Sequence, residues 1–174
     1  ETETLVNNLL KFNYSFLVID LRGQGESINS VRGKLDWRQF SSQDYQGYLA
    51  DLLAVTGFLE EKGIKIENQF LLSSGSGANL ALKFFSLNPK FKAVIVIDPL
   101  ASHEGVAIEK YLDKDQAGKL LFIFSKPNEL ANNLKNLNLK LDIAIFPSNQ
   151  GLKEILVQKE IIDKIKVFLL EHLI

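Results

Sequence analysis

The stretch LLSSGSGANLAL at residues 71–82 decides the fold that this sequence predicts. An apolar run comes first, a cluster of small residues follows it, and an apolar helical pattern comes directly after. A continuous apolar run without polar alternation is typical of a parallel strand covered on both faces. We therefore expect a strand over residues 69–73, a tight turn, and a helix over residues 77–87.

The same alternation of apolar runs and helical periodicity recurs along the chain. Further strands are predicted over residues 16–19, 93–98, 120–125 and 141–146, and further helices over 3–12, 44–62, 106–112, 129–137 and 153–173. Strands that alternate with helices predict an α/β fold with about five mostly parallel strands. No linker or repeat divides the chain, so we expect a single domain over residues 1–174.

Composition narrows the class of protein. The chain has 174 residues, of which 46% are hydrophobic and 24% charged, the balance of an ordinary globular domain. The net charge is -1 and no helix face concentrates lysine, so we expect no nucleic-acid partner. The longest apolar run, Ala93–Ile97, is too short to cross a membrane.

Absent residue types exclude further chemistry. Cysteine is absent, which removes disulfides and thiolate nucleophiles, and two histidines are too few for a histidine-rich metal site. We expect neither a metal nor a cofactor. Methionine is absent too, so we expect that Glu1 is not the original start and that an upstream segment or signal peptide was removed. This leaves the localisation open between the cytoplasm and export.

Two loops carry a resemblance to a known family. Functional residues of parallel sheets lie beyond the carboxyl ends of the strands, where this chain has DLRGQGES at 20–27 and SSGSG at 73–77. These segments resemble the D-x-R-G-x-G-x-S loop and the nucleophile elbow of α/β-hydrolases. Trp37, Phe40, and the dipeptides at 98–99 and 105–106 continue the resemblance over nearly the whole chain. It is closest to the dienelactone-hydrolase-like and small esterase branch, and implies a three-layer α/β/α sandwich.

The resemblance also implies where a catalytic triad would stand. Gly75 occupies the position of the nucleophile and Gln150 that of the base. The position of the acid is taken by Asn128 or, with a one-residue shift, by Pro127. Glycine has no side chain to attack a carbonyl, asparagine cannot offset an imidazolium charge, and an amide cannot accept a proton near neutral pH. We therefore expect a degenerate hydrolase that binds a small apolar ligand or a protein partner.

A displaced nucleophile is the alternative. Ser74 or Ser76 could act with His103 as base in a weak or unconventional esterase, with Asp98 as a possible orienter of the imidazole. Serines in tight turns also cap helices, and either serine could cap the helix that starts near Gly77. The capping role is the commoner one.

Several loop residues are candidates for a ligand pocket: Arg22, Trp37, Phe40, Ser74, Ser76 and His103. Trp37 and Phe40 could wall an apolar pocket or anchor their own loop in the core. Arg22, with Asp20, could instead hold the adjoining loops together through charge-assisted hydrogen bonds.

The family's sheet begins with strands upstream of the helix that opens this chain. One of those strands lies between the strands matched here by residues 16–19 and 69–73, and it contributes an amide to the oxyanion hole. We therefore expect either a slot filled by a missing N-terminal segment or direct pairing of residues 16–19 with 69–73. An exposed strand edge would also favour self-association or a partner.

Overall fold

A computed structural model describes residues 2–12, 14–31, 33–148 and 157–173 of the chain. The chain forms two compact units, which we describe one at a time. Glu1–Phe16 and Glu67–Ile174 form the first, called the sheet unit, and Leu17–Ile66 form the second, called the α2 unit. No helix in the described ranges is long and apolar enough to cross a membrane.

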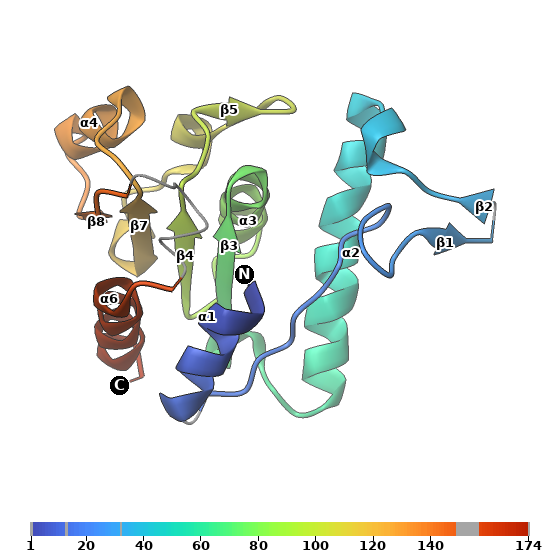
Figure 1. Cartoon of the computed structure of the whole chain (residues 1–174), viewed down its shortest axis with the longest axis horizontal. Coiled ribbons are helices and arrows are strands. Elements are labelled where there is room, and N and C mark those ends of the chain that lie inside the picture. The colour runs from blue at the N-terminus through green and yellow to red at the C-terminus, as the bar shows by residue number, and fades with distance from the viewer. Residues whose placement is uncertain (1, 13, 32, 149–156, 174) are drawn as a thin grey trace. The chain divides into compact units, whose positions relative to one another are not determined.

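A parallel sheet organises the sheet unit (Figure 1). Its strands are β3 (Phe70–Ser74), β4 (Ala93–Ile97), β7 (Leu120–Phe124) and β8 (Asp142–Ile145), in the order β3-β4-β7-β8. Within the described residues β3 pairs with β4 alone, so one edge of β3 is free. The four strands confirm the predicted apolar runs from residue 69 onward, and all pairings are parallel.

Helices cover both faces of this sheet, which gives the expected three layers. The first face carries α1 (Thr2–Leu9) and α6 (Lys159–Glu171), and α3 (Ser76–Leu87) packs against β3 and β4 from the other face (Figure 1). A short α4 (Glu129–Asn136) connects β7 to β8.

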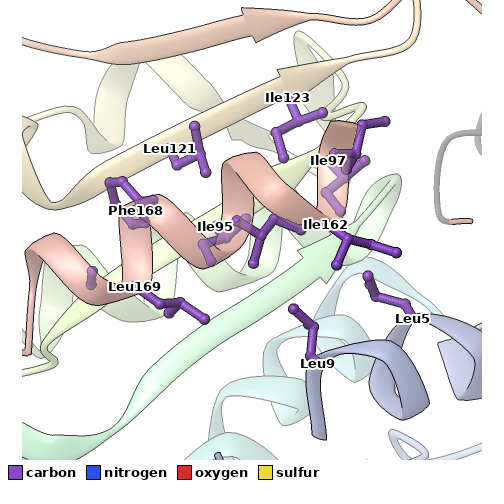
Figure 2. Packing of buried hydrophobic residues seen from close by; sticks show 12 residues of the cluster. Leu5, Leu9, Ile95, Ile97, Leu121, Ile123, Ile162, Phe168 and Leu169 are labelled. Atoms are coloured by element: carbon purple, nitrogen blue, oxygen red, sulfur yellow. The ribbon is translucent and has the colours of Figure 1, made fainter. Parts of the chain in front are cut away.

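Side-chain alternation along the buried strands builds the two halves of the core. Every residue of β4 and β7 is buried. Ile95, Ile97, Leu121 and Ile123 point to the face of α6, where they pack with Phe168 (Figure 2). The residues between them face the other helix layer, as the two-residue period of a strand requires. Buried on both faces, these strands need the continuous apolar sequence that they have.

The α2 unit contains one long helix and short elements. These are a hairpin of β1 (Asn29–Ser30) and β2 (Gly33–Lys34), a 3₁₀ turn at Trp37–Gln39, and α2 (Ser42–Glu61). α2 begins with a capping box, in which the Ser41 hydroxyl accepts from the Asp44 backbone and the Asp44 carboxylate accepts from the Ser41 backbone. Only two α2 residues, Tyr48 and Thr56, are buried.

One predicted element is wrong, and a second is confirmed only in part. Residues 16–19 form no strand, although their sequence is as apolar as that of β4. A strand needs a hydrogen-bonded neighbour, and residues 14–19 make no backbone hydrogen bond to any described residue. The main sheet has four strands among the described residues, close to the expected number of about five. The direct pairing of residues 16–19 with 69–73 stays a prediction, because residues 17–19 belong to the α2 unit.

The short helix predicted over residues 106–112 is confirmed only in part, as a 3₁₀ turn. This segment contains β6 (Val106–Ala107), which pairs with β5 (Ser102–His103), followed by a 3₁₀ turn at Ile108–Tyr111. Glu104 and Gly105 both have positive φ, of 47° and 75°, and form the two-residue turn of this hairpin. The turn chemistry of these two residues overrides the helical spacing that follows them.

Candidate functional site

A tight turn joins β3 to α3. Gly75 lies between the last residue of β3 and the first of α3 with φ 56° and ψ -132°. Its amide donates to the carbonyl of Ile97 at the end of β4 (2.9 Å), and its carbonyl accepts from Ala78 (3.1 Å). A residue with a side chain rarely adopts this conformation, whereas glycine adopts it freely. The sequence expectation of a tight strand-to-helix turn centred on Gly75 is confirmed.

Space around the turn differs between its two glycines. A Cβ atom added at Gly75 would meet no atom within 4 Å. A Cβ atom at Gly77 would lie 2.7 Å from the Ser73 hydroxyl oxygen. A side chain at 77 would therefore require the Ser73 hydroxyl to move, whereas a side chain at 75 is opposed by the backbone conformation alone.

The serines of the turn do not cap the helix. The N-cap residue of α3 is Gly75, and no side chain accepts a hydrogen bond there. The predicted capping by Ser74 or Ser76 is therefore wrong, because the helix begins one residue earlier than expected and Ser76 is itself its first residue.

The alternative nucleophiles are accessible but are not joined to a base. Ser74 is half-buried and Ser76 is exposed, and neither side chain has a hydrogen bond within the described residues. His103 is half-buried in the β5–β6 hairpin. The pairing of either serine with His103 stays a prediction.

Hydrogen bonds continue the sheet beyond the ends of its strands. The amide of Asp98, directly after β4, donates to Ile123 (2.8 Å), and its carboxylate accepts from the amide of Ser125 (2.7 Å). The carbonyl of Ser125 accepts from Ser148 (2.8 Å). Asp98 has φ 47°, an uncommon value for a residue with a side chain. These bonds hold three loops at the carboxyl edge of the sheet.

Asn79 is a structural residue that the sequence analysis did not single out. It is 1% exposed, and its amide group donates to the carbonyls of Leu100 (2.8 Å) and Val106 (3.0 Å). Its carbonyl oxygen accepts from the amide of Leu100 (3.0 Å). Asn79 therefore fixes the β5–β6 hairpin to the first turn of α3. An asparagine between apolar residues on a core-facing helix was the available signal.

Asn128, at the expected acid position, has a structural partner. It is the N-cap of α4, and its side-chain oxygen accepts from the amide of Ala131 (2.8 Å). This bond satisfies one of the free amides at the helix start. Gln150, at the expected base position, lies outside the described residues.

Arg22 of the α2 unit forms an ion pair inside its own unit. Its Nη2 lies 2.5 Å from an Asp51 carboxylate oxygen, and its Nε lies 2.9 Å from the same oxygen. The hydrogen bonds with Asp51 hold the pKa of the Arg22 guanidinium above its ordinary value. The Nη1 atom lies where a Cβ at Gly47 would stand. The structure therefore gives Arg22 the loop-holding role, on Asp51 of α2.

Asp20 also acts locally. Its carboxylate accepts from the amide of Glu26 (3.0 Å) and occupies the space that a Cβ at Gly25 would need. This closes the loop at residues 20–26, where Gly25 has φ 47°.

The two aromatic candidates differ in burial. Phe40 is half-buried and contacts the rings of Tyr45 and Tyr48, with ring centroids 6.0 Å apart in both cases. Burial raises the pKa of the Tyr48 hydroxyl. Trp37 is 44% exposed. Phe40 therefore anchors its segment in an aromatic cluster, while Trp37 leaves much of its indole accessible.

Comparison with known proteins identifies the family. No curated protein and no solved structure matches the chain. A family model described as serine aminopeptidase, S33, matches residues 1–139. The match includes the DLRGQGES loop, the Gly75 turn and Asn128, and it gives no support to the dienelactone-hydrolase branch. Because this match spans most of the 174 residues and agrees with the three-layer fold, the chain belongs to the serine aminopeptidase S33 family of α/β-hydrolases.

Proposed function

We propose that this chain is a catalytically silent member of its family, which binds a small apolar ligand or a protein partner instead of hydrolysing a substrate. The observation that carries the proposal is Gly75. It has the backbone conformation of a nucleophile elbow and no side chain to attack a carbonyl.

The other positions of the triad support the same conclusion. Asn128 is neutral, and its side-chain oxygen already accepts from Ala131, so it cannot orient and charge-stabilise an imidazole as a carboxylate does. Gln150 is an amide, which has no basicity near neutral pH. A binding role is compatible with this loss, because the shape of a fold and its catalytic groups are separate features.

A fluorophosphonate probe tests the proposal directly. The chain is incubated with the probe, and covalent adducts are detected by intact mass beside an active esterase as positive control. We expect no adduct on the folded wild-type chain. Variants Ser74→Ala and Ser76→Ala identify the reacting residue if one forms, and Ser86→Ala on α3 is the matched serine control.

The opposite outcome would support the esterase alternative. An adduct that disappears in Ser74→Ala or Ser76→Ala, and that forms more slowly in His103→Ala, would establish a displaced serine with His103 as its base. The Gly75→Ser variant adds a second check. Serine restored at the elbow should still give no adduct, because the proposal leaves it without a base.

Trp37 gives a direct assay for the binding half of the proposal. It is the single tryptophan and is 44% exposed, so its emission reports on the α2 unit. Saturable energy transfer from Trp37 to an anilinonaphthalene sulfonate dye would support an apolar site near it. Transfer without saturation would count against a small apolar ligand there.

A further inference from the structure

His172, at the end of α6 in the sheet unit, has both ring nitrogens next to backbone carbonyls. It is the C-cap residue of α6 and is half-buried. Its Nδ1 lies 2.8 Å from the carbonyl oxygen of Phe168, one turn earlier in α6, and its Nε2 lies 2.9 Å from the carbonyl oxygen of Gly118. Gly118 belongs to the 3₁₀ turn Ala117–Lys119, directly before β7. The ring therefore connects the end of α6 to the start of a buried strand.

The two contacts of His172 depend on the protonation state of its ring, because a carbonyl oxygen only accepts hydrogen bonds. A neutral imidazole has one N–H donor and one lone pair, so in either tautomer the lone pair would face one of the two carbonyls. The imidazolium ion has two N–H donors and can donate to both carbonyls at once. The geometry therefore favours the charged ring, whichever tautomer the neutral ring adopts.

Two further features of the surroundings favour a positive charge on His172. The C-terminal end of a helix carries partial negative charge, because its last carbonyls lack helical partners. The ring centroid of Phe168 lies 4.3 Å from that of the imidazole, within the range at which an aromatic ring attracts a cation.

No charged side chain in the described part of the chain forms a hydrogen bond or an ion pair with the His172 ring. The charged residues next to its contacts are Glu171 on α6 and Lys119 in the 3₁₀ turn, and their charges are opposite. Glu171 is exposed, and the Lys119 ammonium donates to the carbonyls of Pro89 (3.2 Å) and Phe91 (3.4 Å). The backbone carbonyls are therefore the direct hydrogen-bond partners of the ring.

We propose that His172 is a proton-dependent link, which joins the end of α6 to the Gly118 turn when its ring is protonated and releases the turn when the ring loses a proton to solvent. A histidine ring changes charge between about pH 5 and about pH 8. Because the folded chain prefers the charged ring, the stability contributed by this link is complete at low pH and is lost as the pH rises. This inference does not depend on whether the chain hydrolyses a substrate.

Thermal denaturation of the full chain at about pH 5 and about pH 8.5 tests the proposal. The variant His172→Gln keeps a polar side chain that is neutral at both pH values. It should lower Tm by about 3–10 °C at the lower pH and by less than half as much at the higher pH. The matched control uses His103→Gln, which removes the other histidine of the chain. In this background the effect of His172→Gln should keep the same pH dependence.

Hydrogen exchange of the wild-type chain provides a measurement that needs no variant. The amides of His172 and Leu173 form the last backbone hydrogen bonds at the end of α6. Their protection, corrected for the pH dependence of intrinsic exchange, should fall between the two pH values. The matched control is the amide of Asn88, which caps the end of α3 and should keep its protection.

Three results would overturn the proposal. They are an effect of His172→Gln on Tm that is as large or larger at the higher pH, protection at His172 and Leu173 that does not fall as the pH rises, and protection that falls equally at Asn88. The last would show that the pH change loosens the whole unit instead of the end of α6.

Discussion

Replacing Gly75 with alanine isolates the cost of the elbow conformation. At φ 56° and ψ -132° a residue with a side chain costs about 1–3 kcal/mol in backbone strain. Steric repulsion adds nothing, because a Cβ at this position would meet no atom within 4 Å. The whole destabilisation of Gly75→Ala should therefore come from the backbone. For a chain of this size, about 1–3 kcal/mol lowers Tm by about 2–12 °C.

Gly118→Ala is the matched control in the same unit. Its φ lies outside the positive region and its added Cβ also meets no atom, so it should change the free energy of unfolding by less than about 0.5 kcal/mol. Urea denaturation followed by far-ultraviolet circular dichroism measures both variants. Equal, small effects at the two glycines would refute the reasoning, since residue 75 could then accept a side chain without strain.

Four further predictions concern single side chains. Asn79→Ala removes three hydrogen bonds to Leu100 and Val106 and should lower the free energy of unfolding by about 2–4 kcal/mol. The control Asn133→Ala changes an exposed asparagine and should lower it by less than about 0.5 kcal/mol. Urea denaturation measures both variants. Asn128→Ala should cost about 1 kcal/mol through loss of the α4 cap, whereas Asn128→Asp should keep that stability and yield no hydrolysis of p-nitrophenyl esters; activity in Asn128→Asp would contradict the silent-hydrolase proposal. Tyr14→Phe should raise the free energy of unfolding by up to about 1 kcal/mol, because the buried Tyr14 hydroxyl has no hydrogen-bond partner within the described residues. Thermal denaturation measures the change, and a clearly lower Tm would contradict the prediction. Hydrogen bonds from the Ser41 side chain, and then from its backbone, lower the pKa of Asp44. The contribution of Asp44 to stability is therefore complete above the ordinary aspartate pKa and is lost as the pH falls through the lowered pKa. Carboxyl NMR titration should show a higher Asp44 pKa in Ser41→Ala.

Apolar runs predicted the sheet wherever the run is covered on both faces. β4 and β7 read AVIVI and LLFIF, and every residue of both is buried. Residues 16–19 read FLVI and look the same in sequence, but no described residue pairs with them. Leu17 and Val18 of this segment are also 46% and 58% exposed. Both burial and strand formation depend on neighbouring segments, which the sequence of one segment does not encode.

Roles that depend on neighbouring positions in the sequence could be predicted, and roles that depend on distant partners could not. The Gly75 turn could be predicted because its demand for small residues is local to five positions. The roles of Asn79 and Asp51 could not, because each depends on a partner more than twenty residues away in the chain. The capping role of Asn128 could be predicted from its place directly before a helix, because asparagine is a preferred N-cap residue.

Because of the backbone conformation at Gly75, a change from serine to glycine and a change from glycine to serine affect stability in opposite ways. A change from serine to glycine at such an elbow removes the nucleophile and relieves strain in one step, so selection for stability favours it once activity is dispensable. Under the proposal of a silent hydrolase, the reverse change costs stability at once and restores no activity without an acid and a base. The change from serine to glycine is therefore easier than its reversal, and the turn can persist in a lineage that has lost the catalytic activity.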